Sequence, residues 1–330
     1  MRSPRVFRRC IVILTSVALL ACRRETIPQN IPRKHPGRPV ARIGYVPIAV
    51  ALPLFVAVDN GYFRDEGVDV QLIRINTSND LGTAGTLGRV DFMMPCALNV
   101  IFDIAHTTGI KHKLFGVNVY SDRAPHIADY LVVKHGSEIK KLTDLKGKRI
   151  AGHPGTATLA VLKLAFQKVN IGPNDFTFVP LQPGEWGPAL TSGAVDAVAA
   201  VDPQATQLIV DGVADVLVPG FYAKAIPEMP LSGWWVADAA NRRPDRSTFV
   251  VPVVNAYARA VRYISEHPEE AKRHFKNYVA ISDNALPRMQ LNKWLSPNEI
   301  DVSAIQQMAD AFATNNVIQA KVDAKDFLYK

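Results

Sequence analysis

The chain has 330 residues, of which 38 are basic and 30 acidic, giving a formal net charge of +8. Four arginines and no acidic residue lie in residues 1–21, so the remainder carries a net charge of only +4. It shows no stripe of Lys and Arg interleaved with aromatic residues, which argues against nucleic acid as a partner. Its length is sufficient for two lobes of ordinary domain size.

Residues 1–21 are predicted to be a signal peptide. Arginines precede an apolar run from Cys10 to Leu20, which is too short to span a bilayer as a helix. The stretch Leu19-Leu-Ala-Cys22 resembles a bacterial lipobox, which implies cleavage before Cys22 and lipid attachment to its sulfur. The alternative is an ordinary signal peptide followed by an incidental cysteine. Cys96 would then be the only thiol in the mature lipoprotein, so no disulfide framework is expected.

Residues 22–40 are predicted to form a tether. The stretch RRETIPQNIPRKHPGRPV is basic and rich in proline, which favours an extended chain. Next to a lipid anchor, such a segment suits an anionic membrane surface.

Beyond Val40 short β-branched runs alternate with helical patterns, which is typical of an α/β protein with mainly parallel sheets. Helices are expected at Leu52–Asp59 and Leu159–Lys168. The predicted strands are Ala41–Tyr45, Val68–Arg74, Asp91–Met94, Lys113–Asn118, Tyr130–Lys134, Arg149–Gly152, Thr177–Leu181, Ala197–Val201 and Asp215–Leu217.

The chain contains an internal repeat. The segment GTAGTLGRVD at 82–91 aligns with GPALTSGAVD at 187–196, with six of ten positions identical. Upstream, Arg42-Ile43 and Arg149-Ile150 each begin a strand that is followed by a proline and an apolar helix. The equivalent acids Asp91 and Asp196 suit a role at the start of a strand better than catalysis.

The repeat predicts two lobes built on one plan. We expect one lobe from residues 41–125 plus 232–330 and the other from residues 126–231. The chain would cross between them near 124–130 and 219–234, and two crossings make a hinge. The part after Trp234 is expected to be mostly helical, at Phe249–Glu266, Pro268–Tyr278 and Ser303–Asn315.

Catalytic, cofactor and metal motifs are not recognised. The sequence has no GxSxG elbow, and the GHPGTAT stretch lacks the GK[ST] of a phosphate-binding loop. His106 and His112 are six residues apart, which is not the spacing of a helical zinc pair. We therefore predict no catalytic residue, no cofactor and no metal site.

Ligands of open α/β sheets bind beyond the carboxyl ends of the strands, where helix N-termini present free N–H groups. Any single residue there could instead serve only as a helix cap, and Cys96 or the tryptophans could fill the core. Aromatic residues at the cleft would suit a planar or partly apolar ligand, and Tyr222 is a further aromatic candidate. The predicted ligand-binding residues are Tyr45, Val46, Pro47, Thr77, Ser78, Asn79, Cys96, Ala97, Thr156, Ala157, Thr158, Glu185, Trp186, Asp202 and Trp234.

From Arg42 to Asn284 the chain resembles ABC-transporter substrate-binding proteins of the nitrate, sulfonate, taurine and thiamine-precursor (SsuA/THI5-like) family. The resemblance is carried by GYFRDEGVDV, LTDLKGKRIAGHPGTATLAVL and ALTSGAVDAV. It implies a two-lobed type II periplasmic-binding-protein fold with the ligand between the lobes. The Thr156–Thr158 turn matches the family's ligand-contacting helix start, and Tyr45–Pro47 and Thr77–Asn79 match its first-lobe contacts.

These observations predict a monomeric, non-enzymatic solute-binding lipoprotein of the periplasm, held at the membrane by its lipid anchor. It would bind a small organic ligand (a sulfonate, aromatic acid, pyrimidine or flavin-like compound) and deliver it to an ABC permease driven by an ATPase. No arginine or lysine stands at the ligand-binding turns, which argues against nitrate or a small sulfonate. The alternatives are a sensor or accessory lipoprotein without a transporter, and a THI5-like biosynthetic enzyme.

Overall fold

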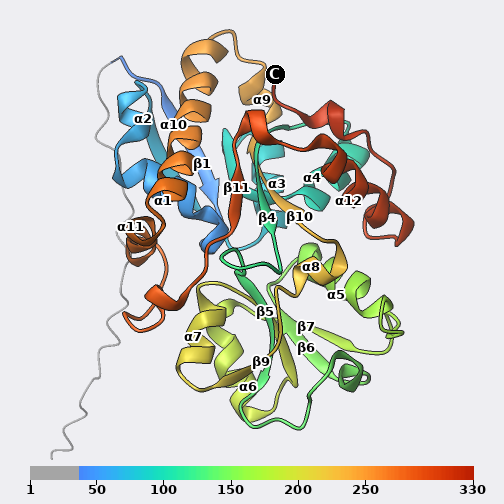
Figure 1. Ribbon diagram of the computed structural model, residues 1–330. Coiled ribbons are helices and arrows are strands. Elements are labelled where there is room, and N and C mark those ends of the chain that lie inside the picture. The colour runs from blue at the N-terminus through green and yellow to red at the C-terminus, as the bar shows by residue number, and fades with distance from the viewer. Residues whose placement is uncertain (1–36) are drawn as a thin grey trace, which may run out of the picture.

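The computed structural model describes residues 37–330. The predicted signal peptide, Cys22 and most of the tether lie outside this range. The described residues form two α/β lobes, each built on one β-sheet with helices on both faces (Figure 1). No helix in this part of the chain has the length and apolar character needed to cross a membrane.

The first lobe contains a six-stranded sheet in the order β11-β4-β10-β3-β1-β2. Helices α1, α2, α10 and α11 cover one face, and α3, α4 and α12 lie on the other (Figure 1). The strands are β1 (Val40–Tyr45), β2 (Asp69–Arg74), β3 (Phe92–Ala97), β4 (Lys113–Tyr120), β10 (Met229–Val236) and β11 (Lys293–Leu295). The helices are α1 (Leu52–Asp59), α2 (Tyr62–Asp65), α3 (Ser78–Thr86), α4 (Leu98–Thr108), α9 (Asp238–Asn241), α10 (Arg246–Glu266), α11 (Pro268–Lys272) and α12 (Val302–Thr314).

The second lobe contains a five-stranded sheet in the order β7-β6-β8-β5-β9. All five residues of β8 (Ala197–Val201) are buried, as expected for an apolar strand that is covered on both faces. The other strands are β5 (Asp129–Lys134), β6 (Arg149–Gly152), β7 (Thr177–Pro180) and β9 (Ala214–Pro219). The helices are α5 (Thr156–Gln167), α6 (Trp186–Ser192), α7 (Gln204–Val210) and α8 (Tyr222–Ala225).

Four of the six strands in the first sheet and four of the five in the second run in the same direction, but both sheets also contain antiparallel strands. In the first, β1 pairs in parallel with β2 and β3, but β10 runs antiparallel to β3 and β4, and β11 antiparallel to β4. In the second, β5 runs antiparallel to both of its neighbours. The reason is that β5 and β10 each enter a sheet directly from the other lobe, without the crossover helix that parallel neighbours require.

The chain passes between the two sheets twice, through residues 121–128 and 220–228. We therefore propose that residues 41–125 plus 232–330 form one lobe and residues 126–231 form the other. The strand β10 was not predicted, because Pro230, Ser232 and Gly233 interrupt its apolar pattern.

The internal repeat has the same hydrogen bonds in both lobes. Asp91 accepts from the backbone N–H and the Nε of Arg42 at 2.9 and 3.0 Å. Asp196 accepts from the same two groups of Arg149 at 2.8 and 3.1 Å. In each lobe the aspartate N–H donates to the arginine carbonyl at 2.8 Å. Each aspartate, which immediately precedes its own strand, therefore binds the beginning of the neighbouring strand.

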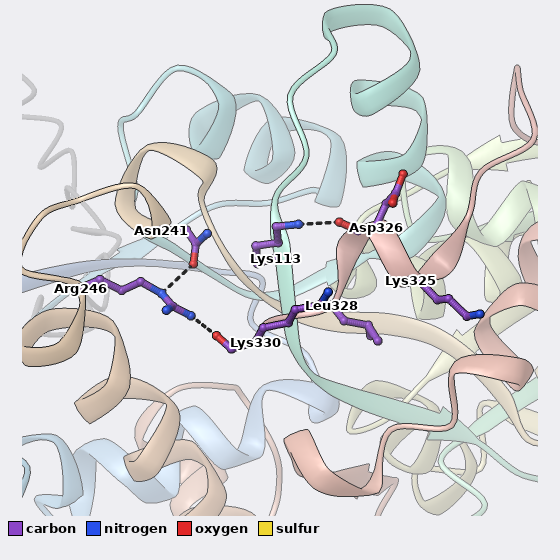
Figure 2. A pocket seen from close by; sticks show the side chains of 7 residues that line it. All are labelled: Lys113, Asn241, Arg246, Lys325, Asp326, Leu328 and Lys330. Carbon is purple, nitrogen blue, oxygen red and sulfur yellow. Dashed lines mark hydrogen bonds between the residues drawn. The ribbon is translucent and has the colours of Figure 1, made fainter.

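The C-terminal segment lies beside the beginning of β4 and is hydrogen-bonded to it (Figure 2). Tyr329 N donates to the Leu114 carbonyl at 2.9 Å, and the Lys113 Nζ donates to the Asp326 carbonyl at 2.5 Å. Arg246 donates to both the Asn241 side chain and the Lys330 carbonyl (Figure 2). These bonds fasten the end of the chain to the first lobe.

We expect Asp91→Ala to lower the free energy of unfolding by about 1–3 kcal/mol, because it leaves the part-buried Arg42 N–H without its partner. Asp196→Ala should cost less, since its side chain is 25% exposed against 9% for Asp91. Asp245→Ala, which breaks an exposed ion pair with Arg243, is the control and should change stability by less than about 0.5 kcal/mol. Urea unfolding measures the free energy of unfolding of all three variants. A larger loss of stability in Asp196→Ala than in Asp91→Ala would contradict the link between burial and cost.

Candidate functional site in the interlobe cleft

A cavity of about 50 Å³ lies between the lobes, where helix N-termini from both sides meet. The first lobe contributes Val46, Ile48, Ser78, Asn79, Ala97, Tyr120, Leu231 and Ser232, and the second contributes His153, Pro154, Gly155, Thr156, Ala157, Thr158, Val201 and Tyr222. A volume of this size holds only a few water-sized groups. The structure therefore has its lobes closed, and a larger ligand requires them to separate.

On the first-lobe side, the starts of α3 and α4 are held together. The Ser78 Oγ accepts from Ala97 N at 3.2 Å, and the Cys96 thiol donates to the Ser78 carbonyl at 3.3 Å. Thr77 caps α3, since its Oγ1 accepts from Asp80 N at 3.1 Å. Ser78, Asn79 and Ala97, at the starts of these two helices, line the cavity.

On the second-lobe side, α5 begins without a side-chain cap. Its N-cap residue is Gly155, whose φ of +115° is a conformation that side-chain-bearing residues rarely adopt. A Cβ at this position would also lie 2.8 Å from the Asn79 Oδ1. Glycine therefore lets the start of α5 approach the first lobe closely.

Two hydrogen bonds join the lobes directly at this point. The Asn99 Nδ2 donates to the Thr156 Oγ1 at 2.9 Å, and Thr156 N donates to the Asn79 Oδ1 at 3.3 Å. The Asn99 Oδ1 is buried and has no partner among the described residues. The residues at the start of α5 thus contribute both to closure and to the cavity wall.

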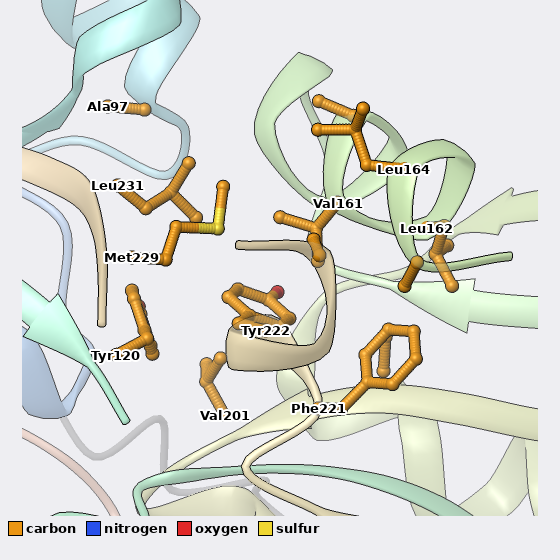
Figure 3. Packing of buried hydrophobic residues seen from close by; sticks show 14 of the residues in the cluster. Ala97, Tyr120, Val161, Leu162, Leu164, Val201, Phe221, Tyr222, Met229 and Leu231 are labelled. Carbon is orange, nitrogen blue, oxygen red and sulfur yellow. The ribbon is translucent and has the colours of Figure 1, made fainter. Parts of the chain in front are cut away.

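Aromatic side chains from both lobes form the floor of the cleft. Tyr222 and Tyr120 lie with their ring centroids 4.8 Å apart, and Met229 and Leu231 pack beside them (Figure 3). The hydroxyl groups of Tyr222 and Thr158 are 3.3 Å apart. The buried apolar cluster runs without a break from one lobe to the other through these residues.

The cavity wall contains no lysine, arginine, aspartate or glutamate. Its one imidazole, His153, has a pKa below the ordinary value because burial disfavours the charged ring. The groups that can bind a ligand are neutral hydroxyls and amides together with helix N-termini. Such a site can hold an oxyanion through N–H groups and helix dipoles, without an ion pair.

Two buried carboxylates, Asp129 and Asp202, lie at the hinge beneath the cavity. Burial raises their pKa values to about 8 and about 7, and the nearby Asp202 charge further raises the pKa of Asp129. Asp129 accepts from Tyr222 N at 2.7 Å, and Asp202 accepts from Thr206 N at 2.9 Å. One oxygen of each carboxylate has no partner among the described residues.

Seven of the predicted residues lie together in the cavity wall: Val46, Ser78, Asn79, Ala97, Thr156, Ala157 and Thr158. Tyr222 and Gly155 join them. Thr77 and Cys96 lie directly behind this wall, the first as a helix cap and the second fully buried. Pro47 lies between the lining residues Val46 and Ile48 without lining the cavity itself.

The structure places the other predicted residues in the core or in caps. Trp186 is fully buried in the second lobe, and its indole donates to the Leu181 carbonyl at 3.0 Å. Trp234 is fully buried against Tyr257, with ring centroids 4.6 Å apart. Tyr45 packs edge-on to Phe55. Glu185 accepts from Gln182 N as a helix cap, and Asp202 lies below the cavity floor.

The cavity wall also contains residues that were not predicted, namely Tyr120, His153, Pro154, Val201, Leu231 and Ser232. His153 and Pro154 precede the predicted turn, so extending that turn toward its strand would have included them. Tyr120 and Ser232 lie on adjacent strands of the first lobe, and only the strand order β4-β10 brings them together.

The fold places the chain in a known class. The alkanesulfonate-binding protein SsuA from Xanthomonas axonopodis pv. citri bound to MOPS matches with a TM-score of 0.71 and 21% identity, covering 88% of this chain and 99% of that one. The described chain therefore has the two-lobed fold of the periplasmic binding proteins.

Residues 49–271 match the family model "NMT1/THI5 like", so the chain belongs to that family. A Bacillus subtilis protein named for binding aliphatic sulfonates is 26% identical over 285 residues, which span 83% of this chain and 81% of that protein. The 4-amino-5-hydroxymethyl-2-methylpyrimidine phosphate synthase of Schizosaccharomyces pombe is 26% identical over 145 residues, 44% of this chain and 39% of that enzyme. These comparisons support a solute-binding protein.

The buried acids predict how stability depends on pH. The folded chain keeps protons on Asp129 and Asp202 that carboxylates of ordinary pKa 3.8 release. Their contribution to the free energy of unfolding is therefore complete below about pH 4 and is lost as pH rises toward 8. In Asp129→Asn this decline should be shallower by up to about 1.4 kcal/mol per pH unit.

Urea unfolding across this pH range measures the effect. The exposed Asp310→Asn variant is the control and should keep the slope of the unchanged chain. An unaltered slope in Asp129→Asn would mean that Asp129 is ionised in the fold.

Proposed function

We propose that the protein is a non-enzymatic solute-binding lipoprotein that closes on a small organic anion of the sulfonate class and delivers it to an ABC permease. The observation that carries this proposal is the cleft itself. Three helices of at least nine residues, α3, α4 and α5, begin at its wall, and no acidic side chain lines it. Helix N-termini attract oxyanions, and relatives named for sulfonate binding support the same class.

The absence of lysine and arginine from the cleft does not exclude a sulfonate. A sulfonate offers three oxygens, which suit several N–H and hydroxyl donors held at fixed positions. The Ser78 hydroxyl can donate to it, and so can one of the Thr158 and Tyr222 hydroxyls, which are hydrogen-bonded to each other. The apolar part of the ligand would lie on Tyr222, Leu231 and Val201.

A ligand screen tests the proposal. The full chain is heated with ethanesulfonate, taurine, MOPS, benzoate, a hydroxymethylpyrimidine or riboflavin, and the unfolding temperature is recorded. A ligand at 100 times its dissociation constant stabilises by about 2.7 kcal/mol. Stabilisation by sulfonates is expected. Stabilisation only by the pyrimidine or riboflavin would contradict the sulfonate assignment.

Closure should depend on the bonds between the lobes. Asn79→Ala removes the acceptor of the Thr156 N–H bond, which should weaken binding of the best sulfonate about fivefold. Isothermal titration calorimetry gives the dissociation constant. Asn284→Ala, at an exposed position outside the cavity, is the matched control and should bind normally. Equal affinity in both variants would show that this bond does not contribute to the ligand-bound form.

Anchoring at Cys22 is a separate part of the proposal, based on the Leu-Leu-Ala-Cys sequence. In cells grown with labelled palmitate, the unchanged chain should carry label and sediment with membranes. Cys22→Ser should carry none and should appear in the soluble exported fraction. Equal labelling of Cys22→Ser would exclude this cysteine as the lipidated residue.

The enzyme alternative is supported by the partial match to a synthase. Burial raises the pKa of the Cys96 thiol to about 12, so this cysteine is a poor nucleophile. We infer that the bound ligand is released unchanged. Product formation from the ligand identified in the screen would overturn the non-enzymatic part of the proposal.

A further inference from the structure

A groove of about 1230 Å³ lies on the first lobe, apart from the interlobe cleft. Its lining residues come mainly from α10, α11 and the segment 287–296, which contains β11, and include Pro125 and His126 of the first chain crossing. No residue that lines it also lines the cleft. Its size is sufficient for an organic molecule well above the size of a simple sulfonate.

Apolar side chains form part of the groove wall. Val261 and Ile264 come from α10, and Met289, Leu291 and Trp294 come from the opposite segment. The Trp294 indole is fixed, because its Nε1 donates to the Val50 carbonyl at 3.0 Å. Each of these side chains is at most 8% exposed, so only a small part of each faces the groove.

The wall also contains a buried amide without partners. Asn292 is 2% exposed, and neither its Nδ2 nor its Oδ1 makes a hydrogen bond with any described residue. Burying an unpaired donor and acceptor is unfavourable, so such groups normally have a partner. A ligand in the groove would supply one.

The unpaired charges of the wall are mainly positive. Three basic side chains of the wall make no ion pair or hydrogen bond with any residue from 37 to 330, namely Arg262, Arg288 and Lys293. Among the acidic side chains of the wall, only Glu266 lacks such a partner within the same residues. The other acids are engaged: Glu66 with Arg259, Glu269 with Lys272, and Glu299 with Ser296. The groove thus favours an anion.

We propose that this groove is a second ligand site, which binds an amphipathic organic anion with an apolar body and one carboxylate group. The carboxylate would be held by Arg262 and Arg288 and would accept a hydrogen bond from the Asn292 Nδ2, and the apolar body would lie on Trp294 and Ile264. This proposal does not rest on the function proposed for the cleft.

Decanoate is the probe, titrated into the full chain by isothermal calorimetry. Saturable binding is expected, and decyltrimethylammonium, with the same chain length and the opposite charge, should bind at least about tenfold more weakly. The double variant Arg262→Ala and Arg288→Ala should weaken decanoate binding by about tenfold, and these exposed positions leave the fold intact. Arg242→Ala, at an exposed ion pair outside the groove, is the matched control.

Further variants separate the groove from the cleft. Asn292→Leu should weaken decanoate binding, and Thr158→Val, in the cleft, should not. Equal binding of the anion and the cation, or loss of binding in Thr158→Val but not in the arginine variant, would overturn the proposal. Binding that appears only after deletion of residues 22–36 would show that the chain's own basic segment fills the groove, and would also overturn it.

Discussion

The hydrogen bonds of Asp129 fix the two chain crossings beside each other, and the geometry of the cleft depends on them. Its carbonyl accepts from Gly220 N at 2.9 Å, and its carboxylate accepts from Tyr222 N at 2.7 Å. Residues of the second crossing are thereby held against the start of β5. Tyr222 is consequently placed with its ring against Tyr120 and its hydroxyl beside Thr158. A fully buried carboxylate is costly unless it is neutral or well bonded, which explains why burial raises its pKa.

Few hydrogen bonds join the closed lobes, which are also held by the apolar contacts around Tyr120 and Tyr222. Besides the bonds of Thr156, Ala49 N donates to the Asp202 carbonyl at 3.0 Å, and Ser282 N donates to the Gln207 Oε1 at 2.9 Å. Each such bond contributes about 1 kcal/mol net, and together they amount to only a few kcal/mol. A ligand that adds hydrogen bonds to both sides of the cleft can therefore shift the balance between open and closed lobes.

The sequence predicted those parts of the fold that depend on local pattern. All nine predicted strands exist, because apolar runs between turns are read directly from the chain. The repeat was informative because the same hydrogen bonds occur in each lobe, between Arg42 and Asp91 in the first and between Arg149 and Asp196 in the second. β10 was missed, since a central strand with proline and glycine has no clear local signal. The same strand supplies Leu231 and Ser232 to the cleft, so missing it also meant missing part of the site.

The tryptophans show that residue type alone does not determine whether a side chain lies in the cleft or in the core. Trp186 and Trp234 were both predicted to contact the ligand, but both indole rings are fully buried inside single lobes. A large apolar ring gains most from complete burial, and a position next to a strand end gives it a core to enter. Tyr222 is also buried, yet its hydroxyl must reach a polar partner, and the partner available is Thr158 in the cleft wall. The bond between the Tyr222 and Thr158 hydroxyls therefore accounts for the place of Tyr222 in the cavity wall, whereas the Trp234 Nε1 is buried and has no partner among the described residues.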